Sequence, residues 1–244
     1  MVVQPPGRAA DGPCFSDVMS EPAADCEPST ATFLFADIAG FTALTEAHGD
    51  EQAATVVARF CEAVTRELPA FGGTHVKTIG DALMLRIPDP AQAVLLGLRI
   101  ALDLLRGHRA PAVRVGLHHG PAVERDGDYF GAAVNLAARV SAAATGGEVL
   151  LTGQTAALAR NVEGVRYESR GCPVLRNVRD PVELVAAVRQ GQTREHRLTI
   201  DPVCRMAVDP ESAPGRLVID DTGYFFCSLA CAGEFAREPK RFVD

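Results

Sequence analysis

One stretch, FLFADIAGFT at residues 33–42, constrains the fold more than any other part of this 244-residue chain. Its apolar run ends on Asp37, and Gly40 then opens an amphipathic pattern. A short apolar run bounded by turn signals is typical of a core strand. A carboxylate at the end of such a strand, followed by a glycine turn and a helix start, suits a site for a metal and a phosphate. A surface loop would also tolerate the acid.

Strand and helix signals alternate from residue 30 to about residue 190, which predicts an α/β sandwich of roughly 160 residues. Alternation and β-branched residues indicate the strands, whereas apolar residues at helical spacing indicate the helices. The predicted strands are 30–37, 74–77, 82–87, 113–120, 149–151 and 182–188. The predicted helices are 42–68 with a break at Gly49–Asp50, 90–106, and one within 128–143 that ends at Gly146–Gly147.

Composition narrows the class of protein. Hydrophobic residues are 47% and charged residues 23%, as in ordinary globular proteins. A net charge of -7 argues against a nucleic-acid polymer as partner. The longest apolar run, 91–105, is interrupted by Arg99 and Asp103, so we expect no membrane association. The first residues lack the apolar core of a secretory signal, which predicts a cytoplasmic protein. In that compartment we expect the seven cysteines to be free thiols or metal ligands and not disulfides.

Four segments differ in composition. Residues 1–28 carry Pro, Gly and acids without periodicity and are predicted to be disordered. The α/β region spans 29–190, and the polar residues 191–198 form a predicted linker. Residues 199–244, called the tail below, hold three cysteines and four phenylalanines. Because a segment this small builds little core, we expect a metal to stabilise it.

Two acids could form the metal site. Asp37 ends the first strand and Asp81 lies in the turn of the hairpin VKTIGDALM. Two carboxylates that come close repel each other unless a cation neutralises them. Mg²⁺ favours one or two carboxylates together with substrate phosphates. The alternative is that Asp37 caps a helix and Asp81 is an ordinary turn residue.

A second pair could bind the rest of a nucleotide. Asn135 and Arg139 lie four residues apart in AAVNLAARV and share one face of the predicted helix. An amide and a guanidinium suit orientation of a ribose and neutralisation of a phosphate. The alternative is a solvated surface pair. Asp128 puts another acid just before this helix.

Taken in order, FLFADIAGFT, VKTIGDALM, VRVGLHHG and DYFGAAVNLAARV resemble the catalytic domain of class III adenylate and guanylate cyclases over residues 29–190. The resemblance implies a cyclase-type α/β sandwich with a ferredoxin-like core. It also implies a head-to-tail homodimer with two shared sites. The reaction implied is attack of the ribose 3′-oxygen on the α-phosphate of a nucleoside triphosphate, with loss of pyrophosphate.

The resemblance also implies a role for each matching residue. Two Mg²⁺ or Mn²⁺ ions would be held by Asp37, Asp81 and the backbone of Ile38, and one chain would supply these ligands. The other chain would read the purine, orient the ribose and stabilise the transition state. In that order, the residues implied are Lys77 with Asp128, then Asn135, then Arg139; Gly40 and Phe41 would bind substrate, and Arg176 stands where the family often has a lysine on the terminal phosphates.

Hydrogen-bond chemistry selects the base. Lys77 only donates and ionised Asp128 only accepts, which matches the N1 acceptor and 6-amino donor of adenine. Guanine reverses both groups and would leave two acceptors facing each other. We therefore predict ATP as substrate.

In the tail, Cys204 lies in DPVCRM, and Cys227 and Cys231 lie four residues apart in CSLAC, which would place both on one helix face. Three soft ligands suit Zn²⁺ or Cu(I), although three packed thiols would explain them as well. The tail resembles the YHS domain, a small treble-clef-like module, but has Arg205 where glycine is usual. A fourth ligand, from water or another chain, stays unidentified.

Three histidines, His75, His118 and His119, have no spacing that suits a metal and are predicted to be structural. Two departures from the cyclase pattern stand out: Ala82 replaces a common glycine, and the connection 120–128 is too short for a long dimerisation arm.

Three functions remain open at this stage. The first is an adenylate cyclase that serves signal transduction and is regulated by a metal at the tail. The second is a guanylate cyclase or a non-catalytic nucleotide-binding regulator. The third is a constitutive cyclase whose tail delivers metal or docks a partner.

Overall fold

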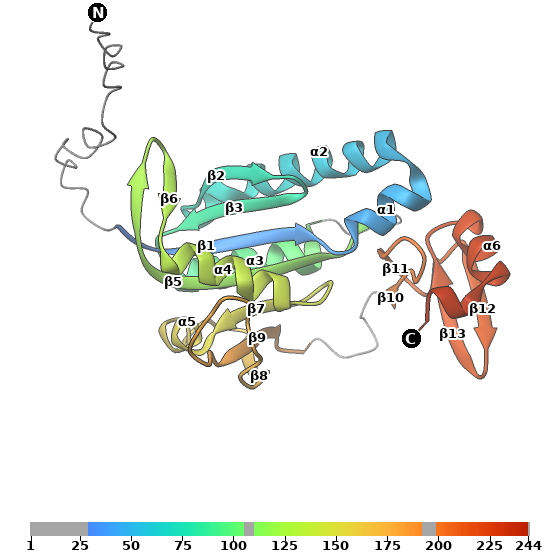
Figure 1. The fold of residues 1–244 in the computed structure, drawn as a ribbon. Coiled ribbons are helices and arrows are strands. Elements are labelled where there is room, and N and C mark those ends of the chain that lie inside the picture. Colours follow the sequence, from blue (N-terminus) through green and yellow to red (C-terminus); the bar gives the residue numbers. More distant parts are fainter. Residues whose placement is uncertain (1–28, 105–109, 192–198, 244) are drawn as a thin grey trace, which may run out of the picture.

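A computed structural model describes residues 29–104, 110–191 and 199–243 (Figure 1). The predicted disordered segment 1–28 and nearly all of the predicted linker lie outside the described residues. Among the helices of the described residues, none is long and apolar enough to cross a bilayer.

One mixed sheet organises the molecule, with strand order β2-β3-β1-β5-β7-β9-β8 and β6 paired to β5. All pairings are antiparallel except that of β5 with β7. The strands are β1 (Ser29–Ile38), β2 (Thr74–Ile79), β3 (Ala82–Ile87), β5 (Val113–Arg125), β6 (Asp128–Phe130), β7 (Val149–Thr152), β8 (Val165–Ser169) and β9 (Leu184–Arg189). The predicted α/β cyclase-type fold is confirmed.

Helices cover both faces of this sheet. They are α1 (Phe41–His48), α2 (Asp50–Glu67), α3 (Pro90–Leu98), α4 (Ala132–Ala143) and α5 (Gly153–Leu158), with a 3₁₀ turn η1 (Leu68–Phe71) after α2. Even-numbered residues of β1, such as Leu34, share a core with α2 and α3, whereas odd-numbered ones, such as Phe33 and Phe35, pack on α4. Because side chains alternate along a strand, Asp37 belongs to the α4 face.

Glycine lets α4 approach the sheet closely. A Cβ on Gly116 of β5 would lie 2.0 Å from the backbone nitrogen of Ser141 on α4, so no larger residue fits there. This contact fixes α4, and with it Asn135 and Arg139, against the centre of the sheet.

Several predicted boundaries differ from the observed ones. The helix from Pro90 changes at Arg99 into a π-helical turn, η2 (Arg99–Asp103). The segment 120–128 is no simple connection, because β5 continues to Arg125 and forms a hairpin with β6. Helix α4 ends at Ala143, before the two glycines are reached, because the backbone of the next residue, Ala144, is extended. The sequence did not predict α5 or β8.

The tail packs onto the cyclase-like region (Figure 1). It consists of β10 (Thr199–Ile200), β11 (Met206–Val208), β12 (Gly215–Ile219), β13 (Thr222–Phe226), α6 (Leu229–Arg237) and a 3₁₀ turn η4 (Pro239–Arg241). Strand β11 pairs with β4 (Ala110–Pro111), which belongs to the main region. Leu44 of α1 and Ala53 of α2 are buried in the same cluster as Phe226 and Phe235 of the tail. The small tail therefore gains core by sharing it.

Candidate functional site

Asp37 and Asp81 come together at one end of the sheet. Asp37 lies within β1 and pairs across the sheet with Ala82, the residue after Asp81. The residue that caps α1 is Gly40, and no side chain forms a capping hydrogen bond. The alternative interpretation of Asp37, that it caps this helix, is therefore wrong. Burial and the negative charge of Asp37 raise the pKa of the Asp81 carboxyl to about 6. Two acids held in this way form a donor set that suits a divalent cation.

Arg114 is a member of this site that the sequence did not reveal. It lies opposite Asp37 in the pairing of β1 with β5. Its Nε donates to Asp37 Oδ2 at 2.5 Å, and Nη2 forms an ion pair with the same oxygen. This guanidinium neutralises one of the two acids in the protein without bound metal.

We expect Asp81→Asn to stabilise the metal-free protein. The substitution removes a carboxylate that Asp37 repels, and because Asp81 is partly exposed the gain is about 1 kcal/mol. The melting temperature should then rise by about 2–4 °C. Folding raises the pKa of the Asp81 carboxyl from 3.8 to about 6. Between these two pH values, the folded protein therefore keeps a proton on Asp81 that the unfolded chain has lost. Wild-type stability therefore falls as pH rises through this range.

Thermal unfolding in chelator from pH 4 to pH 8 measures this effect. The advantage of Asp81→Asn should be absent near pH 4 and complete above pH 6. Asp180→Asn, at an exposed loop position, is the control and should show no pH-dependent gain. An Asp81→Asn protein that is less stable than wild type at pH 8 would show that the two acids do not repel each other.

Lys77 and Asp128 form a second group, also on the α4 side. Lys77 pairs across the hairpin with Met84, which belongs to the α4-facing core. Its Nζ donates to Asp128 Oδ2 at 2.5 Å, and this hydrogen bond lowers the pKa of Asp128. The Lys77 ammonium also lies 5.7 Å from the centre of the Phe130 ring. A donor and an acceptor are thus held side by side next to an aromatic surface.

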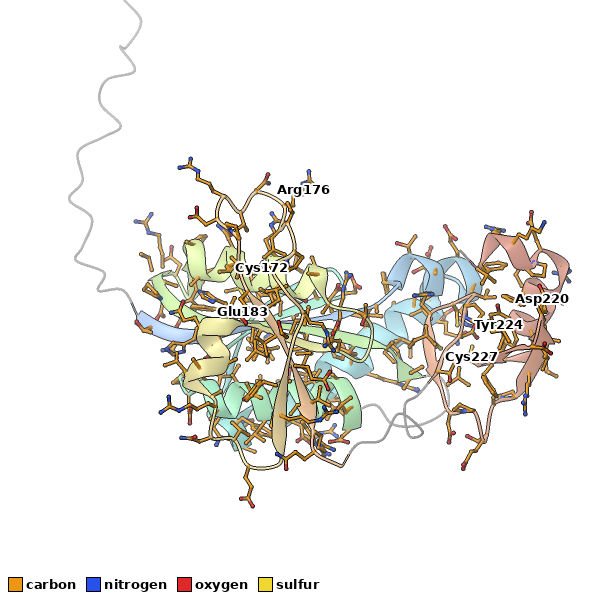
Figure 2. The ribbon with its side chains drawn as sticks, turned by 90° about the horizontal axis from the view of Figure 1, so that it is seen from below. Cys172, Arg176, Glu183, Asp220, Tyr224 and Cys227 are labelled. Carbon is orange, nitrogen blue, oxygen red and sulfur yellow. The ribbon has the colours of Figure 1, made fainter. Side chains whose placement is uncertain are left out.

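Asn135 and Arg139 share the outward face of α4. Both are exposed, while Ala133 and Ala137 of the same helix are buried against the sheet. No ion pair joins Arg139 to the part of the chain that the structure describes. Arg176 lies apart from these groups, in the loop between β8 and β9, and Figure 2 shows it at the edge of the molecule.

The turn between β1 and α1 carries the remaining predicted residues. Gly40 has φ 77°, a left-handed conformation that glycine adopts without strain. Ile38, the last residue of β1, is buried in the core that the sheet shares with α2 and α3, and Phe41 packs against both this main core and the tail core. A Cβ on Gly40 would lie 2.5 Å from Cβ of Arg205, so the tail touches this turn directly.

The three tail cysteines gather with a histidine that the sequence did not indicate. His48, the last residue of α1, joins Cys204, Cys227 and Cys231, and their ligand atoms all lie within 4.8 Å of one another. Cys227 follows β13 and precedes α6, so the prediction that it shares a helix face with Cys231 is wrong. The reason is Ser228, whose hydroxyl caps α6 by accepting a hydrogen bond from the Cys231 N–H.

The three histidines that were predicted to be structural, His75, His118 and His119, each lie within hydrogen-bond distance of a threonine. His118 Nδ1 lies 2.9 Å from Thr152 Oγ1, and His119 Nδ1 lies 2.9 Å from Thr32 Oγ1. Burial lowers the pKa of His118 to about 4, so its ring is neutral. His75 is exposed on β2 beside Thr78. Within the described residues, none of the three belongs to the His/Cys cluster.

Comparison with known proteins identifies the family to which this chain is similar. The family model for the adenylate and guanylate cyclase catalytic domain matches residues 26–185. The pH-sensitive adenylate cyclase MT1302 of Mycobacterium tuberculosis is 36% identical over 166 residues, which are 67% of this chain and 41% of that protein. An adenylate cyclase of Streptomyces griseus is 31% identical over 179 residues, 72% of this chain and 44% of that protein. The chain thus spans less than half the length of these relatives.

Solved structures show the same fold. An adenylate cyclase of Trypanosoma brucei, determined in its monomeric state, superposes with a TM-score of 0.60 at 26% identity. The match covers 67% of this chain and 90% of that one. The family match and the shared fold agree, and the chain belongs to the class III adenylate and guanylate cyclase family.

Proposed function

We propose that this protein is an adenylate cyclase that converts ATP to cyclic AMP and pyrophosphate. The observation that carries the proposal is the close approach of the Asp37 and Asp81 carboxyls at the end of the strand that leads into the Gly40 turn. The two named relatives described above are both called adenylate cyclases. Residues 29–190 would form the catalytic domain.

The two acids would hold divalent cations, which the family uses. Their mutual repulsion and the ion pair of Asp37 with Arg114 fit a site that is built for positive charge. Bound Mg²⁺ or Mn²⁺ would lower the pKa of the ribose 3′-hydroxyl and neutralise the triphosphate. The backbone of Ile38 and Gly40 would position the ions and phosphates, because N–H groups at a helix start favour anions.

Residues of a second chain would complete the site. Asn135 and Arg139 project outward from α4, so a partner molecule can bring its own pair to the acids of this chain. Asn135 would orient the ribose, and Arg139 would donate to the α-phosphate as charge develops there. Each chain holds both sets of residues, so a head-to-tail homodimer would contain two equivalent sites.

The base would be read by Lys77 and Asp128. Their side chains lie side by side, with Lys77 as donor and Asp128 as acceptor. One edge of adenine presents an acceptor at N1 beside a donor at the 6-amino group, which this pair can satisfy completely. With guanine, Asp128 would face an oxygen and both acceptors would stay unsatisfied.

A nucleotide assay tests the proposal. Purified full chain with Mn²⁺ should produce cyclic AMP at least about 5-fold faster than cyclic GMP at equal substrate, because one mismatched hydrogen-bond pair costs about 1–3 kcal/mol. Asp37→Ala should abolish turnover, whereas the control Asp180→Asn should leave it unchanged. Faster production of cyclic GMP would show that the base assignment is wrong, and no product from either nucleotide would contradict the proposed activity.

The tail would be a regulatory module. Its residues 199–244 resemble a YHS domain in sequence, and a hairpin, a helix and a cysteine cluster would suit a treble-clef-like metal site. Because this module contacts the Gly40 turn through Arg205, a change in the tail can reach the proposed active site.

A further inference from the structure

Four potential metal ligands come from two regions that are far apart in the sequence. Cys204 Sγ lies 3.4 Å from Cys227 Sγ, which lies 3.7 Å from Cys231 Sγ. His48 Nε2 lies 3.7 Å and 3.8 Å from the sulfurs of Cys227 and Cys231. A disulfide needs sulfurs about 2.05 Å apart, so these thiols are not oxidised to one another.

These four distances are close to the edges of a zinc tetrahedron, and the two remaining distances, from Cys204 to Cys231 and to His48, do not exceed 4.8 Å. With Zn–S of about 2.3 Å and Zn–N of about 2.0–2.1 Å, neighbouring sulfurs lie about 3.8 Å apart and sulfur and nitrogen about 3.6 Å apart. Three thiolates and one imidazole close the shell, as in structural zinc sites. The three cysteines are buried and His48 is half-buried, so the donors enclose a centre that is largely shielded from solvent.

A buried carboxylate fixes the two cysteine segments relative to each other. Asp201 is fully buried, and its Oδ1 accepts hydrogen bonds from the backbone N–H groups of Val203 and Cys204. Its Oδ2 accepts one from the N–H of Cys227 at 2.8 Å. The carboxylate is thereby occupied by backbone donors, and the thiols stay oriented toward His48.

We propose that His48, Cys204, Cys227 and Cys231 bind one Zn²⁺ that clamps the tail to helix α1 and holds Arg205 on the Gly40 turn. Binding would release three thiol protons and leave a centre of charge -1. The clamp would join both ends of α1 to the tail. His48 is the last residue of the helix, and Gly40, which precedes its first residue, lies against the Cβ and Cγ atoms of Arg205.

The backbone of Arg205 supports a functional role. Its φ is 63°, a left-handed conformation that favours glycine and is unusual for arginine. Arg205 follows the ligand Cys204, and its N–H donates to the carbonyl of Asp201 at 2.9 Å. The side chain is exposed, and no hydrogen bond or ion pair joins its guanidinium to the rest of the described chain. A free cation is therefore held beside the turn that, on the proposed function, contacts the triphosphate.

Metal analysis tests the clamp without reference to activity. Full chain purified under reducing conditions should contain one Zn²⁺ per chain, and so should His75→Ala, the matched control for an exposed histidine outside the cluster. His48→Ala should bind zinc at least about 100-fold more weakly in competition with a chromophoric chelator. His48→Cys should restore binding, and with Co²⁺ it should give stronger thiolate charge-transfer absorption than wild type.

The clamp would be overturned by an absence of zinc in the wild-type chain, by copper in place of zinc, or by a His48→Ala protein that binds zinc as tightly as wild type. The Co²⁺ spectrum of the wild-type chain shows which ligands bind the metal. The proposal can therefore still be tested if His48→Ala fails to fold. A spectrum without thiolate charge transfer would equally contradict the proposal.

Nucleotide binding tests the coupling to Arg205, which rests on the proposed function. The dissociation constant of 3′-deoxy-ATP with Mn²⁺, measured by calorimetry, needs no turnover. In zinc-loaded protein, Arg205→Ala should raise this dissociation constant about 5- to 10-fold. Removal of zinc from the wild-type chain should raise it by the same factor. Removal of zinc from Arg205→Ala should then raise it no further, because both changes disrupt the same interaction. Arg216→Ala, an exposed arginine of the tail, is the control. Equal affinity in all forms would overturn the coupling, whereas tight binding without cyclic AMP would contradict only the proposed activity.

Discussion

Arg139→Ala is expected to lower the rate of cyclic AMP formation about 10²- to 10³-fold, because one preorganised donor to developing charge has about that effect. Arg139 is exposed on α4 and lacks an ion-pair partner in the described part of the chain, so its charge is available to a substrate. The same loss should appear in kcat and in kcat/KM, since the interaction would form only in the transition state.

A conservative variant separates charge from geometry. Arg139→Lys keeps the positive charge but loses the planar fork that matches phosphate oxygens, so its rate should lie between those of Arg139→Ala and wild type. Arg160→Ala, an exposed arginine after α5, is the control and should retain wild-type turnover. Arg139→Ala turnover within about 3-fold of wild type would show that Arg139 does not stabilise the transition state.

The elements that the sequence predicted well are those whose signals are local. The apolar run of β1, the break at Gly49 and the hairpin around Gly80 each depend on neighbouring residues, and each lies where it was predicted. Local signals also place Asp37 at a strand end and Asp81 in a turn. That the two meet follows from the antiparallel pairing of β1 with β3, which a single strand pattern does not specify.

The residues that sequence reasoning missed are those that depend on long-range contacts. Arg114 reaches Asp37 only through the register of β1 with β5, 77 positions apart. His48 lies 179 positions from Cys227 and has the appearance of an ordinary helix end. The one available signal for His48 was indirect: the three cysteines of the tail do not complete a four-coordinate metal site, so a fourth ligand had to come from elsewhere.

The tail also shows why a small segment is hard to interpret alone. Its buried Phe226 and Phe235 share a cluster with Leu44 and Ala53, so part of its core belongs to another region. Strand β11 likewise finds its partner β4 in the main region. Composition predicted that a metal would stabilise the tail, but only the folded chain shows that helices α1 and α2 also contribute residues to its core.

Mixing two inactive variants, Asp37→Ala and Arg139→Ala, is expected to restore activity. In a head-to-tail dimer, one site of the heterodimer takes Asp37 from the Arg139→Ala chain and Arg139 from the Asp37→Ala chain, and is intact. Random reassortment makes half of the dimers mixed, and each mixed dimer has one good site of two. The mixture should therefore recover about a quarter of wild-type turnover, since heterodimers with symmetric interfaces form without preference.

A second mixture provides the matched control. Asp37 and Asp81 approach each other within one chain, so a heterodimer of Asp37→Ala with Asp81→Ala has a damaged acid pair in both sites. This mixture should stay inactive even though its dimers form equally well. Native mass spectrometry would establish that heterodimers are present before rates are compared. An inactive first mixture with proven heterodimers would mean that each site is built within a single chain, and the outward face of α4 would then need another explanation.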